Sequence, residues 1–565
     1  MKPRIFSPYA FLLILAYVIA AAPLLLQGFP KGHDWIFELV RIAEYNHALA
    51  DGQYPPYWGG NLYGDYGSPI FLFYAPLFLF VSSLFAGLFD SFVTGGTAAL
   101  LFFLFIAIFT VGKMMRTVLA DSTMESQAGA RVAIYFFLLN PYLLGNMLIR
   151  NADAEFTGMC LAPLALAGLL LINTDRRRGA ILLAAGLGLT IIAHNLTALV
   201  TMAMVISAAL ALYLPKKSTR LWGGIAGGLV LGLVLAAFFW VPALVMKSAV
   251  QTDQLLIGKF DFHNQFQPLK SFFGHSQFFS TGFFPILLGI SCRVGWQIRK
   301  QNTIVKRLLY FGLGCAVIFL FLQTRASIFL WEKIPFLPLF QFPWRFMGPL
   351  ALVAAILAGI CFARLFSEKS KKTLLIGEIV VLILCIFNGL PQLLKYKPLG
   401  QSISARLPEI LTEQGIRKSF QTATVMNEYL PSKAQPFTCR LLRPANGPVI
   451  KTEPPAQVIV RANGKTEIEL KIKTAESTRV RIARWFFQGW RCIINESVQE
   501  IQPNKYGSID IPIPTGRNKI TLEMRPPRVR VICLWFSLVG LVVFILMTTG
   551  VIANETEKPP TNYEH

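Results

Sequence analysis

The residues of this chain that could carry out chemistry are a few charged side chains at the ends of long apolar stretches. Asp34 stands in the sequence GHDW, and Arg150, Asp153 and Glu155 stand in RNADAE at 150–155. A charge at the centre of a membrane-spanning helix costs about 2.5–3.5 kcal/mol on insertion scales, so such side chains normally face protein or water. A carboxylate placed in this way can act as a general base, and an arginine can bind phosphate.

Asp34 comes directly before a stretch with helical periodicity, Trp35–Ala50. Apolar residues recur on one face of this stretch and charged residues lie off it, which predicts an amphipathic helix in the membrane interface. Two compatible roles are open for Asp34: an N-cap of the helix, or a general base that the helix start keeps ionised. The apolar face is Ile36, Leu39, Val40 and Ala43, and the charged residues are Glu38, Arg41 and Glu44.

Arg150, Asp153 and Glu155 lie where a predicted span leaves the membrane, and two interpretations are open. The first is an ion pair at the membrane interface. In the second, Asp153 or Glu155 joins Asp34 as a catalytic carboxylate while Arg150 binds substrate. No definite cofactor is predicted; the candidate is a divalent cation with Asp34 and Glu155 as possible ligands, although these acids share no metal-binding spacing.

Three further residues are candidates for substrate binding. His33 is next to Asp34, and His194 interrupts the apolar stretch Ala180–Leu214, where a turn capped by Asn195 is the alternative role. Arg345 follows QFPW and either reaches the lipid headgroups or binds a lipid-linked phosphate. His263 and His275, in a loop rich in aromatic residues, are minor candidates.

The motifs of soluble enzymes are missing from the sequence. It has no P-loop, no GxGxxG that opens a helix after a strand, no GxSxG and no HExxH. Six of its eight cysteines fall in or beside apolar runs. The other two, Cys439 and Cys492, lie in a polar region and could form a disulfide if that region is outside the cytoplasm.

The composition is that of an integral membrane protein. The chain has 565 residues, of which 54% are hydrophobic and only 15% are charged. Its net charge of +23 does not indicate nucleic acid, because Lys and Arg cluster in short loops between apolar runs, as the positive-inside rule describes. The runs predict about twelve membrane-spanning helices, in the plasma (inner) membrane.

The basic loops orient these helices. Five of them are placed in the cytoplasm, and the polar segments with the candidate site residues then all fall outside it. One of two helices within Pro69–Val111 must be short, tilted or re-entrant, because the charge rule requires an odd number of crossings there. The five basic loops are Lys113–Arg131, Asn173–Gly179, Pro215–Arg220, Arg299–Arg307 and Ser367–Lys372.

Residues Lys395–Pro527 differ in character from the rest of the chain. Strand-like alternation appears within them, with turn signals such as Asn463–Gly464 between the alternating segments. We predict a transmembrane helical domain at 1–394 with an external loop at 27–69, an extracytoplasmic sandwich-like β-domain at 395–527, and a last helix with a cytoplasmic tail at 528–565. The alternating segments are Glu467–Ile472, Val480–Arg484, Ile509–Ile513 and Lys519–Met524.

Several motifs resemble one family of multi-pass membrane proteins, labelled 6-pyruvoyl-tetrahydropterin synthase-related. They are GHDW with DGQYPPYW and NLYGDYGSPIFLFYAPL, then RNADAEFTGMCLAPLAL, AHNLTAL, QFPWRF, EYLP and WFFQGW. That family is in turn similar to the GT-C class of integral membrane glycosyltransferases. The resemblance implies a GT-C-like helical domain, polyprenyl-phosphate-linked sugars as donors, Asp34 as the first-loop acid and Asp153 or Glu155 as the second. Here the first-loop acid is a lone HD rather than a DD or DE pair.

Two functions are compatible with these features. In the first, the chain transfers a sugar with inversion from a polyprenyl-phosphate donor to an extracytoplasmic glycan or protein acceptor, with Asp34 as general base. In the second, it is a non-enzymatic transporter or an assembly subunit for lipid-linked glycans, and its acids need not converge. Both predict membrane lipid as a partner and exclude nucleic acid.

Overall fold

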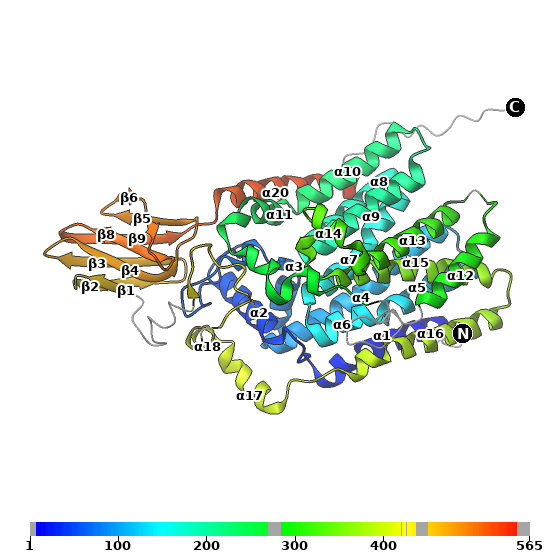
Figure 1. Ribbon diagram of the computed structural model, residues 1–565, viewed down its shortest axis with the longest axis horizontal. Coiled ribbons are helices and arrows are strands. Elements are labelled where there is room, and N and C mark those ends of the chain that lie inside the picture. Colours follow the sequence, from blue (N-terminus) through cyan, green and yellow to red (C-terminus); the bar gives the residue numbers. More distant parts are fainter. Residues whose placement is uncertain are drawn as a thin grey trace.

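A computed structural model describes residues 7–268, 284–301, 303–419, 421–424, 426–436 and 450–550. Figure 1 shows long helices running side by side, with all the strands gathered at one end and both chain termini toward the other. We call the end of the helical part nearest the strands the sheet end and the opposite one the far end.

The helices follow the apolar runs of the sequence. They are α1 (Pro8–Gln27), α2 (Trp35–Ala50), α3 (Pro76–Phe89), α4 (Phe92–Leu119), α5 (Met124–Leu138), α6 (Pro141–Gly145), α7 (Asp153–Leu171), α8 (Arg176–Ala193), α9 (Asn195–Tyr213), α10 (Thr219–Leu235), α11 (Ala237–Val245), α12 (Phe284–Gln297), α13 (Ile304–Phe321), α14 (Ile328–Lys333), α15 (Met347–Leu365), α16 (Lys371–Leu394), α17 (Gln401–Ile410), α18 (Glu413–Lys418) and α20 (Arg528–Thr549). Short 3-10 turns include η1 (Ile70–Leu72), η3 (Lys247–Ala249), η4 (Thr252–Leu256) and η10 (Pro343–Phe346), and η2 (Asn146–Arg150) is a π-helical turn.

By length and composition, nine helices in the described part of the chain could cross a membrane, or ten if α10 and α11 form one span bent by 72°. About twelve were expected from the apolar runs. The difference arises at short or charged elements: α12 has only 14 residues, and α8 begins with three consecutive arginines. The number of crossings therefore stays a prediction.

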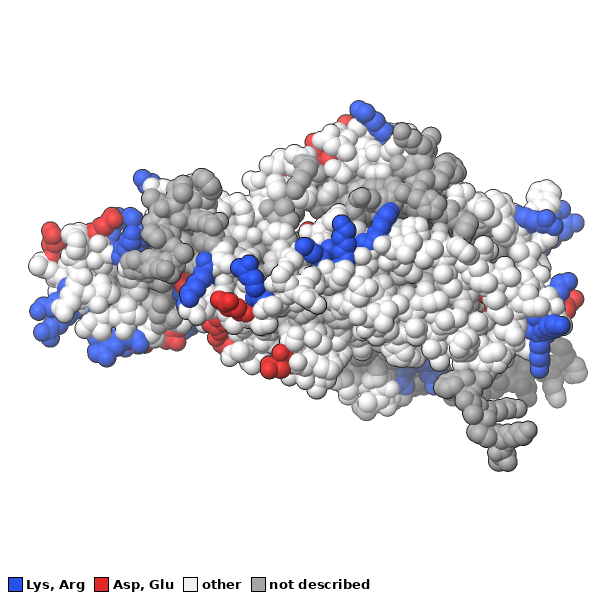
Figure 2. Space-filling model, turned by 90° about the horizontal axis from the view of Figure 1, so that it is seen from below, with Lys and Arg blue, Asp and Glu red and all other residues white. Residues whose placement is uncertain are grey.

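The region Pro69–Val111 has the two unequal helices that the charge rule requires. α3 has 14 residues, too few for a bilayer core about 30 Å thick, whereas α4 has 28. α3 is thus the short helix of the pair. Figure 2 shows that most of the helical surface in view carries no charge and that Lys and Arg gather at the far end.

The centre of the helical part is the pair α7 and α8 with α15. Almost every residue of α7 and α15 is buried. α7 and α8 approach closely at glycines: a Cβ on Gly168 would overlap the backbone nitrogen of Leu183, and one on Gly186 would overlap that of Ala165. Small residues let helix backbones approach in this way inside membranes.

The strands form two antiparallel sheets. One has the order β1-β4-β8-β7 and the other β2-β3-β9-β5-β6. The sequence predicted β3, β4, β8 and β9, whose side chains alternate between buried and exposed; it missed β2, an edge strand with Ile459 and Val460 exposed, and the short strands. The strands are β1 (Ile450–Glu453), β2 (Gln457–Asn463), β3 (Glu467–Thr474), β4 (Thr478–Trp485), β5 (Trp490–Ile494), β6 (Ser497–Gln499), β7 (Gln502–Pro503), β8 (Ser508–Ile513) and β9 (Gly516–Met524).

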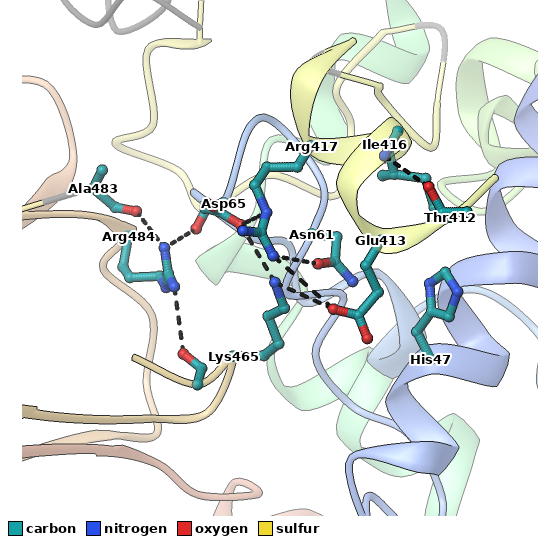
Figure 3. A network of polar contacts seen from close by, with 12 residues as sticks. His47, Asn61, Asp65, Thr412, Glu413, Ile416, Arg417, Lys465, Ala483 and Arg484 are labelled. Carbon is teal, nitrogen blue, oxygen red and sulfur yellow. Dashed lines mark hydrogen bonds and ion pairs between the residues drawn. The ribbon is translucent and has the colours of Figure 1, made fainter. Parts of the chain in front are cut away.

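An ionic cluster centred on the buried Asp65 joins the chain after α2 to α18 and to the sheets (Figure 3). Asp65 Oδ1 lies 2.7 Å from Arg417 Nε and 3.5 Å from Lys465 Nζ, and the backbone oxygen of Asp65 accepts a hydrogen bond of 2.6 Å from Arg484. Lys465 Nζ also lies 3.6 Å from Glu413. Burial lowers the pKa of Lys465. The sheets are therefore fixed to the first polar loop rather than only tethered by α20.

Candidate functional site

The two polar loops that contain the candidate acids lie against each other at the sheet end. The backbone N–H of His33 donates to the oxygen of Ile149 at 2.9 Å, and that of Asp34 donates to the oxygen of Arg150 at 3.0 Å. Gly32 N–H donates to Asn151 Oδ1 at 2.8 Å. A Cβ on Gly32 would overlap Asn151 Oδ1, so this approach requires glycine. The structure thus brings Asp34 and the segment 150–155 together.

Asp34 occupies the N-cap position of α2, but its side chain makes no capping hydrogen bond. Its backbone angles, φ −105° and ψ 14°, are not those of an extended N-cap residue. The side chain is partly exposed, and His33 beside it is exposed. A cap role therefore does not account for Asp34, and its carboxylate accepts no hydrogen bond from the described residues.

Glu155 lies between two arginines. Its Oε2 is 3.4 Å from Arg150 Nη1 and 3.6 Å from Arg345 Nε, and its Oε1 accepts a hydrogen bond from the Tyr142 hydroxyl. The Arg150 guanidinium also lies 4.4 Å from the ring centroid of Trp344. Glu155 is 4% exposed, so its charge is compensated within the protein. Its position suits an anchor for the two arginines better than a free base.

Asp153 has a different environment although it is two residues away. Its exposed fraction is 0%, and neither carboxylate oxygen has a hydrogen-bond partner among the residues that the structure describes. The charges whose fields act on it are Glu38, Arg41 and Asp34. Buried polar groups are nearly always paired, so this carboxylate is exceptional.

The sequence did not single out a second buried network, which connects α2 to the chain after η1. Arg41 Nη1 lies 2.6 Å from Glu38 Oε1 and donates to the Tyr74 hydroxyl at 2.9 Å, and that hydroxyl donates to Glu38 Oε1 at 2.6 Å. Burial raises the pKa of Glu38, while Arg41 and Tyr74 act in the opposite direction. The spacing of Glu38 and Arg41, three residues apart on a helix, was the available signal.

The three charged residues that the sequence places off the apolar face of α2 are buried. Glu38, Arg41 and Glu44 are 2%, 7% and 1% exposed. Their face is covered by segments distant in sequence: Glu44 Oε1 accepts from the N–H of Asn61 at 2.8 Å, and Arg41 Nε donates to the oxygen of Ala423 at 2.7 Å. The periodicity of α2 shows a polar face but cannot show that other segments cover it.

The segment that covers α2 comes from the region before the strands. We call its described residues, 421–424 and 426–431, the cover segment. Tyr63 donates to Asn427 Oδ1 at 3.0 Å, and the ring of Tyr429 stacks on that of Phe73 with centroids 5.8 Å apart. Gln251 N–H donates to the oxygen of Leu430 at 3.0 Å. The cover segment is thus held against α2 and the first polar loop at several points.

A narrow cavity of about 30 Å³ lies between α7, α9 and α15. Glu155, His194 and Arg345 line it, and most of its other walls are apolar, including Met204 and Leu352. Met204 also lines a second cavity whose walls are entirely apolar. His194, not Asn195 as the alternative had it, caps α9: its Nδ1 lies 3.3 Å from Thr197 N and 2.8 Å from Thr197 Oγ1. His194 therefore both caps a helix and lines the cavity.

No group of three or more His, Cys, Asp or Glu among the described residues is arranged to hold a metal ion. Asp34 and Glu155 are the predicted ligand pair. Glu155 forms ion pairs with two arginines, so its carboxylate is already occupied. Cys439 and His275 lie outside the described residues, so the disulfide with the buried Cys492 stays a prediction.

Comparison with known families gives a match over more than half of the chain. Residues 71–394 match a family model described as the 6-pyruvoyl-tetrahydropterin synthase related domain, a membrane protein. The chain belongs to this membrane-protein family. The family resemblance expected from the sequence motifs is thereby confirmed. None of the curated proteins compared with the chain matches it.

Solved structures that resemble the chain include an arabinofuranosyltransferase and an oligosaccharyltransferase, all with TM-scores below 0.5. The mycobacterial arabinofuranosyltransferase AftD has TM-score 0.45 and 16% identity, over 67% of this chain and 27% of its own. An oligosaccharyltransferase of Archaeoglobus fulgidus, tethered with an acceptor peptide, has TM-score 0.47 and 13% identity, over 75% and 60%. ArnT from Cupriavidus metallidurans, bound to undecaprenyl phosphate, has TM-score 0.42 and 14% identity, over 81% and 97%. The chain thus spans about a quarter of AftD and 60% of the oligosaccharyltransferase.

Proposed function

We propose that this member of the family transfers a sugar from a polyprenyl-phosphate donor to an acceptor at the sheet end, outside the cytoplasm. The observation that carries the proposal is the contact between the Asp34 loop and the segment 149–151, beside a cavity with a polar end and apolar walls. A lipid-linked sugar has this same division between a charged head and an apolar chain.

Arg150 and Arg345 bind the phosphate of the donor. Arg150 and Arg345 meet one carboxylate, Glu155, so their two positive charges are only half neutralised by it. Guanidinium groups bind phosphate oxygens through paired N–H donors, and in a buried site such charges act strongly. Glu155 and Tyr142 then hold the arginines in place, and His194 lines the same polar end.

Asp34 supplies the proton acceptor. Its carboxylate takes the proton from an acceptor hydroxyl, and the hydroxyl oxygen forms a bond with the anomeric carbon of the sugar. The bond between that carbon and the phosphate oxygen breaks from the opposite face, which inverts the configuration, and the lipid phosphate leaves against Arg150 and Arg345. Because the cavity is only about 30 Å³, donor entry requires the helices that line it to move apart.

The transport alternative predicts acids that do not converge, with Asp34 far from both Arg150 and Glu155. The hydrogen bond of 3.0 Å from Asp34 N–H to the oxygen of Arg150 favours the transfer reaction instead.

The donor is tested first, by mass spectrometry of lipid extracted from the purified protein. A retained polyprenyl-phosphate sugar is expected in wild-type protein and its loss in Arg345→Gln, with Arg325→Gln, an exposed arginine, as the control. Recovery of bulk phospholipid alone from wild-type protein contradicts the proposal.

The role of Asp34 as general base is tested in a transfer assay with the donor that mass spectrometry identifies. Asp34→Asn is expected to lower the transfer rate by about 10²–10⁴-fold, the usual contribution of a general base. Asp51→Asn, at the other end of α2, is the matched control and is expected to retain wild-type transfer. Near-wild-type transfer by Asp34→Asn excludes the assigned role.

A further inference from the structure

The five-stranded sheet carries an unusual group of cations on its outer face. Along β3 and β9 the even-numbered side chains are buried between the sheets and the odd-numbered ones point outward. At the Thr474 end of β3 and the Gly516 end of β9, the four outward residues are all basic and all exposed. They are Lys471, Lys473, Arg517 and Lys519, which we call the basic array.

The register places these cations directly opposite one another. Lys471 pairs with Lys519, and Lys473 pairs with Arg517. Directly opposed side chains on one face have Cβ atoms about 4.5–5.5 Å apart, and residues two apart along a strand are separated by about 6.6 Å. Like charges in such positions destabilise a sheet. None of the four has a carboxylate within 4.0 Å among the described residues.

The same two strands contain three acids: Glu467 and Glu523 lie at their other ends, and Glu469 lies two residues from Lys471 on the outward face of β3. Glu467 pairs with Glu523 in the register, and Glu523 in turn lies 2.6 Å from Arg525. Because β9 leads directly into α20, the acidic end adjoins the helical part and the basic array lies toward the outer end of the sheets. Figure 2 shows both basic and acidic side chains at this outer end.

We propose that the basic array is a docking surface for an acidic glycan, whose carboxylate or phosphate groups neutralise the opposed cations. The proposal rests on the proposed function in one respect: it names an acidic glycan as the acceptor class. The array is about half a strand, on the order of 13 Å, beyond the acidic end of β3 and β9, so it lies farther from the helices than that end does. A glycan bound there is held by the sheets while its end reaches the site.

Charge repulsion argues for a bound anion, and the surroundings favour a glycan over a nucleic acid. Across the register from Lys473 and Lys471 on β2 lie Gln457 and Ile459, and Thr521 follows Lys519 on the same face of β9; none of the three is aromatic. Proteins that bind single-stranded nucleic acid usually combine positive charge with aromatic side chains on which bases stack. A polymer with spaced acidic groups needs only the cations.

The test is binding of polygalacturonate to the full-length chain in nanodiscs of zwitterionic lipid, measured by biolayer interferometry. Wild-type protein is expected to bind it, with affinity that falls as salt rises, and to bind uncharged dextran far more weakly. The variant with Lys471→Gln, Lys473→Gln, Arg517→Gln and Lys519→Gln is expected to bind about tenfold more weakly or worse, since four exposed ionic contacts are lost. Its melting temperature is expected to stay level or rise, because like-charge pairs are removed.

The matched control is Lys451→Gln with Lys505→Gln, which removes exposed cations elsewhere on the strands and loops of this domain. It is expected to bind as wild type does. Equal binding by the four-site variant and wild type overturns the docking surface. Tighter binding of a single-stranded oligonucleotide or of anionic vesicles than of polygalacturonate overturns the glycan assignment.

The outcome is separable from that of the proposed function. Asp34→Asn is expected to bind polygalacturonate as wild type does, because the array lies outside the site. If the array binds the acidic glycan while no lipid-linked sugar is found, the docking surface is supported and the transfer reaction is contradicted. If the donor is found and the four-site variant still binds normally, the transfer reaction stands and the acceptor class is wrong.

Discussion

Asp153 and Glu155 stand two residues apart in the first turn of α7 and have opposite electrostatic surroundings. Glu155 contacts two guanidinium groups and a tyrosine hydroxyl, whereas both carboxylate oxygens of Asp153 are buried without a partner among the described residues. A buried charge is tolerable when paired and costly when alone. Removing each carboxylate should therefore have opposite consequences for stability.

Glu155→Gln is expected to lower the free energy of unfolding by about 3–5 kcal/mol, because it leaves Arg150 and Arg345 buried without a counter-charge. Asp153→Asn is the matched variant and is expected to leave stability unchanged or to raise it, because it removes an unpaired buried charge. The measurement is unfolding of the detergent-solubilised protein in increasing denaturant. Equal destabilisation by both variants contradicts the assigned contacts.

At the scale of helices, the close packing of α7 on α8 depends on glycine. Gly186 faces the backbone of α7 so closely that a methyl group would overlap Ala165, whereas Gly227 on α10 has no heavy atom near the position of a Cβ. This crossing sets the position of α7, whose first turn carries Asp153 and Glu155, and of α8, which ends next to His194. A change at the crossing should therefore reach the site.

Gly186→Ala is expected to destabilise the protein by about 1–3 kcal/mol through overpacking. Gly227→Ala is the control and is expected to be neutral or to stabilise by up to about 1 kcal/mol, since alanine is the better helix former. Thermal unfolding in one detergent compares the two. Equal melting temperatures for both variants and wild type would show that α7 and α8 are farther apart than the structure has them.

Across the whole molecule, the site loops, the cover segment and the sheets lie at one end of the helices. The short basic loops such as 173–175 and 367–370 lie at the other, where Lys and Arg gather in Figure 2. If the positive-inside rule holds, the sheet end is outside the cytoplasm. The transfer reaction requires this arrangement, because lipid donor and water-soluble acceptor meet at that interface.

Reporter fusions test the arrangement directly. Alkaline phosphatase fused after Trp35, Ala154 or Gly464 is expected to be active, and fused after Thr174 or Lys369 to be inactive, with a cytoplasmic reporter giving the reverse pattern. Trp35 and Ala154 on opposite sides of the membrane would remove the site altogether. Activity at Thr174 together with inactivity at Trp35 would instead invert the whole chain.

The sequence by itself determined the membrane class, the positions of most long apolar helices, α2 to the residue, and four of the strands. It could do so because these depend on local hydropathy and periodicity. It also named His33, Asp34, Arg150, Asp153, Glu155, His194 and Arg345, since ionisable residues within or directly beside membrane segments normally face protein or water. Only the tertiary structure decided that Glu155 is paired while Asp153 is not, that Glu38, Arg41 and Tyr74 form a buried network, and that residues 421–431 cover α2. Those outcomes depend on contacts between segments distant in the chain. The periodicity of a single segment carries no information about such contacts.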